Sequence, residues 1–104
     1  MSSGITHQFT WDPRKAKRNI QKHKISFGEA SAVFKDPLAI TVFDDSHSDY
    51  EEERWATIGQ IQGQLLVVVV HQVLADDGST IHLHLISARP ATSHERRQYE
   101  EGDS

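Results

Sequence analysis

Histidines, cations and one glutamate are scattered along the chain, and together they carry the chemistry needed to cleave a phosphodiester. Cleavage of RNA without a metal ion needs a base for the 2′-OH proton, an acid for the leaving 5′-oxygen and cations for the crowded phosphate. Histidine suits the acid and base roles, and arginine binds phosphate as a fork. Most soluble domains contain such residues, so the set indicates a site only if the fold gathers it. The candidates are Lys22, His23, Glu53, Arg54, His71, His84, Arg89, Arg96 and Arg97.

The pair His82-x-His84 is a second candidate, for a metal ion. Residues i and i+2 of a strand face the same way, so both imidazoles would reach one ion, with His71 across a hairpin as a third ligand. No acidic residue stands at a suggestive spacing, and a half-exposed polar strand face explains the pair as well. The chain has no cysteine, which excludes thiolate metal sites and disulfides. We expect neither a metal nor another cofactor.

Charge is segregated along the chain. Residues 1–35 carry seven Lys or Arg and two acids, and residues 36–53 carry seven acids and no Lys or Arg. Residues 54–104 carry four Arg and six acids, so the net charge of −4 hides a local basic block. A nucleic-acid footprint needs clustered cations rather than a high overall charge. A solvated face of a basic helix explains the same block, and charge alone does not separate these two interpretations.

Length and composition predict a single domain. A chain of 104 residues has room for one core, which we place at residues 7–101, with tails at 1–6 and 102–104. Hydrophobic residues make up 37% of the chain, fewer than in an average domain, so we expect a partner to cover part of the surface. No apolar run approaches the ~18 residues of a membrane span, and residues 1–9 lack the features of a secretory signal. We expect a cytoplasmic protein without membrane contact.

Capping signals predict where the helices begin. Asp12 is a preferred N-cap and Pro13 suits the first helical position, and Ala16, Ile20 and His23 then fall on one face. So narrow an apolar stripe predicts a helix on the surface of the domain. Capping-box spacing, Ser or Thr followed three residues later by Glu, opens two further helices, at Ser26–Glu29 and Thr92–Glu95.

The remaining pattern is typical of strands. Leu65–Val70 is apolar at every position, which predicts a central strand covered on both faces, and Asp76–Ser79 predicts a hairpin turn. Two helices before a mainly antiparallel meander and one after it indicate an α+β domain. The first two helices cover one sheet face, so the other face needs the last helix or a partner. The predicted order β-α-α-β-β-β-β-α places strands at 7–11, 38–43, 53–61, 65–70 and 80–88, and helices at 13–23, 27–35 and 92–101.

A series of long motifs runs in a fixed order over residues 8–101. It comprises Trp11-Asp12-Pro13-x-Lys15-Ala16-x-x-Asn19-x-x-Lys22-His23-x-Ile25-Ser26-Phe27-x-Glu29-Ala30, Asp36-Pro37-Leu38, Glu53-Arg54-x-x-x-Ile58-Gly59, the strand Leu65–Val70, and Ile86-Ser87-Ala88-Arg89-x-Ala91-Thr92-x-x-Glu95-Arg96-x-x-Tyr99-Glu100. The series resembles the BrnT toxin family. The resemblance implies a RelE-like ribonuclease fold and a metal-independent, RNA-cleaving toxin of a type II toxin–antitoxin pair. It also implies a BrnA-like antitoxin with a ribbon-helix-helix domain, through which alone operator DNA is bound, and a homodimer or a heterotetramer with that antitoxin.

The resemblance and the predicted elements together suggest a role for each candidate. Arg89, at the end of the last strand, would stabilise phosphate charge, Arg54 would supply a second cation, and Glu53 a base. His23 ends the first helix, where the helix C-terminus favours a protonated imidazole. His84 lies mid-strand and would act as an acid or as a ligand to phosphate. The expected RNA-binding residues are Lys15, Lys22, Arg96 and Arg97.

Three stretches depart from the family pattern. The family often has Arg-x-Arg before Ile86-Ser87-Ala88-Arg89, where this chain has His82 and His84. The loop over 72–79 looks longer, and Ser93-His94 stand where the family tends to be more basic. Lower potency, an altered base preference or an inactive copy would each fit these changes. The alternative function is therefore a non-catalytic subunit that binds the antitoxin and acts as co-repressor of its own operon.

Overall fold

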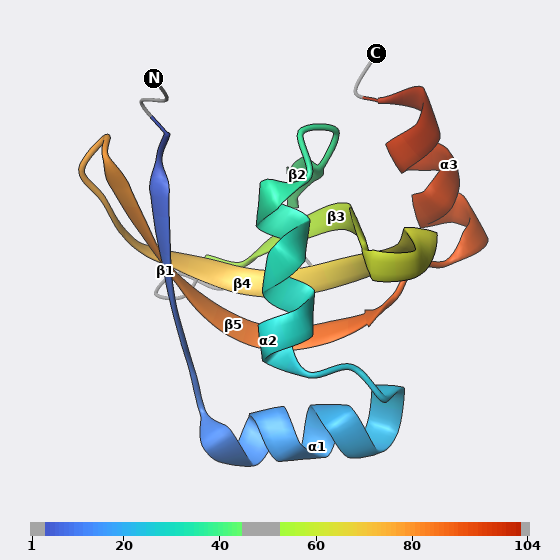
Figure 1. Ribbon diagram of the computed structural model, residues 1–104, viewed down its shortest axis with the longest axis horizontal. Coiled ribbons are helices and arrows are strands. Elements are labelled where there is room, and N and C mark those ends of the chain that lie inside the picture. Colours follow the sequence, from blue (N-terminus) through green and yellow to red (C-terminus); the bar gives the residue numbers. More distant parts are fainter. Residues whose placement is uncertain (1–3, 45–52, 103–104) are drawn as a thin grey trace.

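The computed structural model describes residues 4–44 and 53–102, and within them one mixed sheet carries the helices (Figure 1). Its strands are β1 (Thr6–Trp11), β2 (Ile40–Phe43), β3 (Trp55–Ile61), β4 (Leu65–Asp76) and β5 (Thr80–Pro90). They lie in the order β1-β5-β4-β3-β2. β1 pairs with β5 in parallel, and the other neighbours are antiparallel. The predicted α+β class, element order and mainly antiparallel sheet are confirmed.

The helices begin where the capping signals predicted. They are α1 (Pro13–His23), α2 (Phe27–Ala30) with its 3-10 continuation η1 (Ser31–Lys35), a 3-10 turn η2 (Gln62–Gln64), and α3 (Ser93–Glu101). The Asp12 carboxylate accepts a hydrogen bond from the Arg14 N–H at 2.8 Å at the start of α1. Both capping boxes are formed, at the starts of α2 and α3. None of the helices in the described ranges is long and apolar enough to cross a bilayer.

One face of the sheet is covered by α2 and η1, which cross it in Figure 1. Gly59 on β3 is required beneath them, because a Cβ at this position would lie 2.7 Å from the Val33 Cβ. This close approach seats η1 on the sheet and closes the core. The core cluster comprises Ile25, Phe27, Ala30, Val33, Val67, Val69, Leu83, Leu85 and Ala88.

The inward face of α1 differs from the predicted one. Ile20, expected on the buried face, is 46% exposed, and the polar Asn19 is 6% exposed in its place. The Asn19 amide hydrogen-bonds backbone groups of Ile25 and Ala88, which would otherwise be buried without partners, a costly arrangement. The hydrogen bonds of Asn19, and not apolar burial of Ile20, therefore decide which face of α1 meets β5.

The middle strand β4 is central, as predicted, but it is longer than expected. It continues to Asp76 and pairs with β5 throughout, with register shifts after Val70 and after Val73. The prediction of a longer loop over 72–79 is therefore wrong, because residues 72–76 extend the hairpin and only the short segment that follows forms the turn. Of the acidic stretch predicted as a loop, residues 45–52 lie outside the described ranges.

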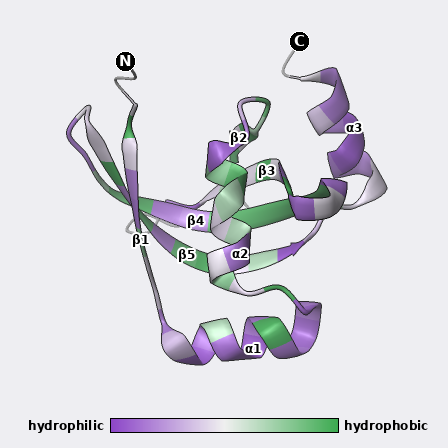
Figure 2. Cartoon of the chain, in the orientation of Figure 1, coloured by the Kyte–Doolittle hydropathy of each residue, from purple (hydrophilic) through white to green (hydrophobic). Residues whose placement is uncertain are grey.

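The last helix, α3, is attached to the domain through polar contacts. It is hydrophilic along its length (Figure 2) and buries none of its residues. The Tyr99 hydroxyl donates to the Asp36 carboxylate at 2.6 Å, which raises the pKa of Tyr99 to about 12. The second contact is an ion pair between Glu95 and Arg89. These two contacts lie four residues apart on α3, so they hold one face of the helix.

Candidate active site

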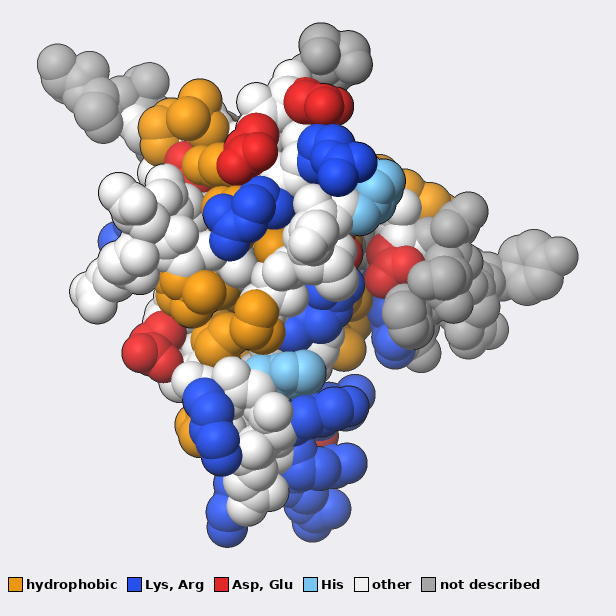
Figure 3. All heavy atoms as spheres, turned by 90° about the vertical axis from the view of Figure 1, so that its right-hand side faces the viewer, with side chains coloured by type: hydrophobic (Ala, Val, Ile, Leu, Met, Phe, Trp, Pro, Cys, Tyr) orange, Lys and Arg blue, Asp and Glu red, His pale blue; other side chains and the backbone are white. Residues whose placement is uncertain are grey.

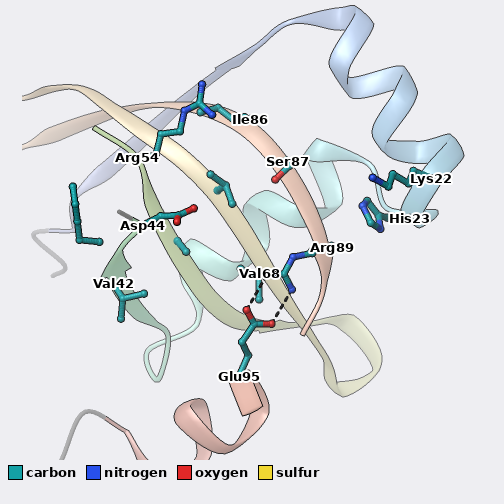
Figure 4. Close-up of a pocket in the computed structure, with 13 residues that line it drawn as sticks. Lys22, His23, Val42, Asp44, Arg54, Val68, Ile86, Ser87, Arg89 and Glu95 are labelled. Carbon is teal, nitrogen blue, oxygen red and sulfur yellow. Dashed lines mark hydrogen bonds and ion pairs between the residues drawn. The ribbon is translucent and has the colours of Figure 1, made fainter. Parts of the chain in front are cut away.

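A cavity of about 500 Å³ opens on the sheet face opposite α2 and η1 (Figure 4). Val68 and Val70 line it and alternate along β4 with the core residues Val67 and Val69, whose side chains point to the other face. The cavity therefore lies on the face that the first two helices were predicted to leave open. Its charged and polar lining consists of Lys22, His23, Asp44, Arg54, Ser87, Arg89 and Glu95.

Four residues proposed from the sequence meet in this cavity. Lys22 and His23 are the last residues of α1, Arg54 immediately precedes β3, and Arg89 lies near the end of β5. In Figure 4, Arg54 lies on one side, Lys22 and His23 lie on the other, and Arg89 lies between them and Glu95. Three segments far apart in the sequence thus bring an imidazole and three permanent cations to one hollow.

Asn19 fixes the end of α1 against β5 and so sets this arrangement. Its Nδ2 donates to the carbonyls of Ile25 at 2.9 Å and Ala88 at 2.8 Å, and its Oδ1 accepts from the Ala88 N–H at 3.0 Å. Ala88 directly precedes Arg89, and His23 follows Asn19 by one helical turn. One buried side chain therefore ties the backbone that carries the imidazole to the backbone that carries the guanidinium.

Arg89 is held by an ion pair with Glu95. Nη1 and Nη2 of Arg89 donate to the two carboxylate oxygens of Glu95, each at 2.8 Å. Hydrogen bonding from Arg89, together with the Thr92 N–H, lowers the pKa of Glu95 to about 2, and the bond to Glu95 raises the pKa of Arg89. The charge of Asp44 acts on the Arg89 pKa in the same direction. Both partners are therefore ionised at neutral pH, and the guanidinium has a defined orientation.

The other residues proposed from the sequence lie outside this cavity lining. His84 points to β1, where its Nδ1 hydrogen-bonds the Thr10 hydroxyl at 2.9 Å. Glu53 is exposed beside Arg54. Lys15 lines a smaller hollow that adjoins the cavity along α1. The remaining two, on α3, are exposed: Arg96 and Arg97.

The three-histidine metal hypothesis fails on geometry. His71 is 2% exposed and faces the core side of the sheet, where its Nε2 hydrogen-bonds the Thr57 hydroxyl at 2.8 Å and its ring lies edge-on to Phe34. His84 occupies the opposite face, because His71 pairs with Leu85 in the sheet register. The idea of His71 as a third ligand is therefore wrong. In the described ranges no group of three His, Cys, Asp or Glu residues is placed to hold a metal ion.

Sequence reasoning missed two polar residues of the site. Glu95 was assigned only to the capping box of α3, although its carboxylate also binds Arg89. Its spacing from Arg89, across one short turn, was the available signal. Ser87 was overlooked because a lone serine on a strand carries no motif, yet it lines the cavity between His23 and Arg89 in Figure 4.

Comparisons with known proteins agree with this fold and site. The family model described as "Ribonuclease toxin, BrnT, of type II toxin-antitoxin system" matches residues 11–95. The crystal structure of the ribonuclease toxin BrnT from Brucella abortus, at 1.1 Å resolution, is similar with a TM-score of 0.56 at 23% sequence identity. That match covers 86% of this chain and the whole of the Brucella chain, and it shows a shared fold. A search of curated proteins found no match. Since the family model spans most of the sequence, this chain belongs to the BrnT family of ribonuclease toxins of type II toxin–antitoxin systems.

Proposed function

We propose that this toxin cleaves RNA in the cavity of Figure 4 by general acid–base chemistry, without a metal ion. The observation that carries the proposal is the convergence of Lys22, His23, Arg54 and Arg89 on one hollow. Three permanent cations attract a phosphodiester, and they repel a divalent metal ion from the same space. The cavity therefore suits a phosphate whose negative charge increases during the reaction.

The proposed reaction is an internal transfer at phosphorus. A base takes the proton of the 2′-OH, the 2′-oxygen forms a bond to phosphorus, the bond from phosphorus to the 5′-oxygen breaks, and an acid protonates that oxygen. The products are a 2′,3′-cyclic phosphate and a 5′-hydroxyl. We assign one proton transfer to His23, the imidazole that lines the cavity. Glu53, exposed next to Arg54, is the candidate for the other, because Glu95 is held in its ion pair.

The ion pair with Glu95 leaves Arg89 able to bind phosphate. Arg89 has five N–H groups. Two donate to Glu95, and a second Nη1–H donates to the Pro90 carbonyl at 3.3 Å. The Nε–H and one Nη2–H remain, and they form the side-on fork that arginine uses for phosphate. Glu95 thus acts as a positioning residue, and Arg89 stabilises the charge of the transition state.

The proposal is tested with purified toxin and a labelled single-stranded RNA in excess EDTA. We expect cleavage to persist, the products to carry 2′,3′-cyclic phosphate ends, and a 2′-deoxy nucleotide at the cleaved position to block the reaction. Lys35→Ala, an exposed cation on the opposite face of the sheet, is the control and should cleave like the wild type.

Two outcomes would contradict the proposal. Loss of cleavage in EDTA, restored by one divalent ion, would mean that a metal takes part. A folded toxin that binds its antitoxin yet leaves RNA intact would establish the alternative, a non-catalytic co-repressor subunit. The histidines at positions 82 and 84, where the family often has arginine, are the feature that favours this alternative.

As a member of a type II toxin–antitoxin family, this toxin acts with an antitoxin. We infer that the partner is BrnA-like, with a ribbon-helix-helix domain, and that its arm covers the cavity. The rim supports this inference, because Val42 and Phe43 of β2 are 41% and 44% exposed beside the cations. An arm with acidic and apolar side chains would meet both features. The assembly, a heterotetramer in this proposal, would bind operator DNA through the antitoxin alone.

Binding kinetics and inhibition test the proposed partner. Electrostatic attraction mainly speeds association, and buried apolar contacts slow dissociation. We therefore expect the on-rate to fall with salt while the off-rate changes little, and we expect the complex not to cleave RNA. Phe43→Ser should raise the off-rate. A complex that forms but still cleaves RNA would contradict coverage of the cavity.

A further inference from the structure

A second hollow continues the cavity along α1. It encloses about 190 Å³ and shares Lys22, His23, Ile86 and Ser87 with the cavity of Figure 4. Beyond these shared residues, its lining consists of Lys15, Arg18 and Asn19. The two hollows therefore form one groove, which runs from Arg89 to the exposed face of α1.

The α1 part of the groove is strongly basic. Lys15, Arg18 and Lys22 follow the spacing i, i+3 and i+7, which places them on one side of a helix. No Asp or Glu lines this hollow. Figure 3 shows the result as a gathering of Lys and Arg side chains at the lower end of the molecule, where α1 lies, with a histidine directly above it.

These cations stand on a rigid support. Asp12 caps the start of α1, Asn19 clamps its last turn to β5, and Lys24 ends the helix in a left-handed conformation. Seven residues of helix separate the outer cations by about 10 Å along its axis. Positions held this way cost less conformational entropy on binding than cations on a loop would. The arrangement fits an extended polyanion better than a single small anion.

We propose that α1 holds the RNA backbone on one side of the scissile phosphate, as a phosphate-binding subsite of Lys15, Arg18 and Lys22. This inference rests on the proposed cleavage site, and it adds Arg18 and the substrate class. The hollow has no Phe, Trp or Tyr in its lining, so it offers no stacking platform for bases. The subsite therefore recognises backbone phosphates irrespective of sequence and favours RNA that extends past the cleaved bond.

The test compares two double variants that remove the same charge from the same helix. Lys15→Ala/Arg18→Ala removes two subsite cations, while Arg14→Ala/Lys17→Ala removes two exposed cations that line neither hollow. The probe is a fluorescein-labelled 2′-O-methyl oligonucleotide, which binds but lacks the 2′-OH needed for cleavage. Its dissociation constant is measured by anisotropy over a salt series, and cleavage of long and short RNA is measured in parallel.

We expect the subsite variant to bind more weakly, with the slope of log affinity against log salt reduced by about 1.4, at about 0.7 per lost phosphate contact on a single strand. The weakening should be similar for probes of different sequence. The KM for long RNA should rise while kcat and the cleavage of short RNA stay unchanged. The matched control variant should follow the wild type.

Equal weakening by both double variants would overturn the subsite, since only overall charge would then matter. Weakened antitoxin binding with unchanged RNA binding would also overturn it, because the groove would then belong to an acidic protein arm. If the wild type fails to cleave RNA but the two variants still differ in probe affinity and salt slope, the proposed reaction is wrong and the RNA subsite stands.

Discussion

Replacing Asn19 perturbs the contact that joins α1 to β5, and its cost can be worked out from the structure. The side chain makes three hydrogen bonds of 2.8–3.0 Å while only 6% exposed. Each such bond contributes about 1 kcal/mol net, and an unsatisfied buried partner costs about 1–3 kcal/mol. Asn19→Ala leaves the Ala88 N–H and C=O and the Ile25 C=O without that partner. We expect a loss of about 3 kcal/mol in the free energy of unfolding.

Urea denaturation, followed by circular dichroism, measures this loss. At about 4–8 °C per kcal/mol for a domain of this size, the Tm should fall by roughly 10–20 °C. RNA cleavage should also decrease, because Lys22 and His23 lose their fixed position relative to Arg89. Gln21→Ala, an exposed site on the same helix, is the control and should stay within about 0.5 kcal/mol of the wild type.

A second variant separates the donors from the acceptor. Asn19→Asp keeps an oxygen for the Ala88 N–H but replaces the Nδ2 donor by a carboxylate oxygen that faces two carbonyls. It should destabilise the toxin at neutral pH at least as much as Asn19→Ala does. If either variant unfolds within about 0.5 kcal/mol of the wild type, the range of ordinary surface substitutions, then the clamp does not hold α1.

Three further predictions concern the core and the ion pair. Gly59→Ala forces a Cβ against Val33, so the urea midpoint should fall by the equivalent of about 1–3 kcal/mol, and an unchanged midpoint would contradict that close approach. Burial lowers the pKa of His71 from 6.5 to about 4, so the unfolded chain binds the proton more readily, and stability should fall by about 2 kcal/mol from pH 7 to pH 5. His71→Gln should reduce this pH dependence, and an equal fall in that variant would assign it to other groups. Glu95→Gln removes the charge that orients Arg89 and should lower the cleavage rate about tenfold, or ~1.4 kcal/mol in activation free energy; a higher rate would mean that the ion pair holds Arg89 away from RNA.

Local signals were sufficient to predict most of the fold. The N-cap at Asp12 and the two capping boxes depend on residues within one turn of each other, and the structure forms all three. The length of β4 was not predictable in the same way. Residues 72–76 stay in the strand because β5 pairs with them after two register shifts, and a register shift depends on a partner strand rather than on local sequence.

The site was only partly predictable, for a related reason. Residue type alone suggested Arg54 and Arg89, and both line the cavity. The inward turn of Asn19 depends on backbone groups of β5, which are 69 residues away in the chain. The face of His71 depends on sheet register. Hydrophobic periodicity places an apolar Ile20 inside, and it contains no information about a distant carbonyl that needs a donor.

The most direct test of the central claim is the single-turnover cleavage rate of Arg89→Ala on a defined RNA. Removal of one group that stabilises charge in the transition state lowers the rate by about 100-fold or more, and we expect a loss of that size with the circular dichroism spectrum unchanged. Arg89→Lys keeps the charge but loses the fork, and it should fall between the two. A wild-type rate in folded Arg89→Ala would contradict the placement of the active site in this cavity.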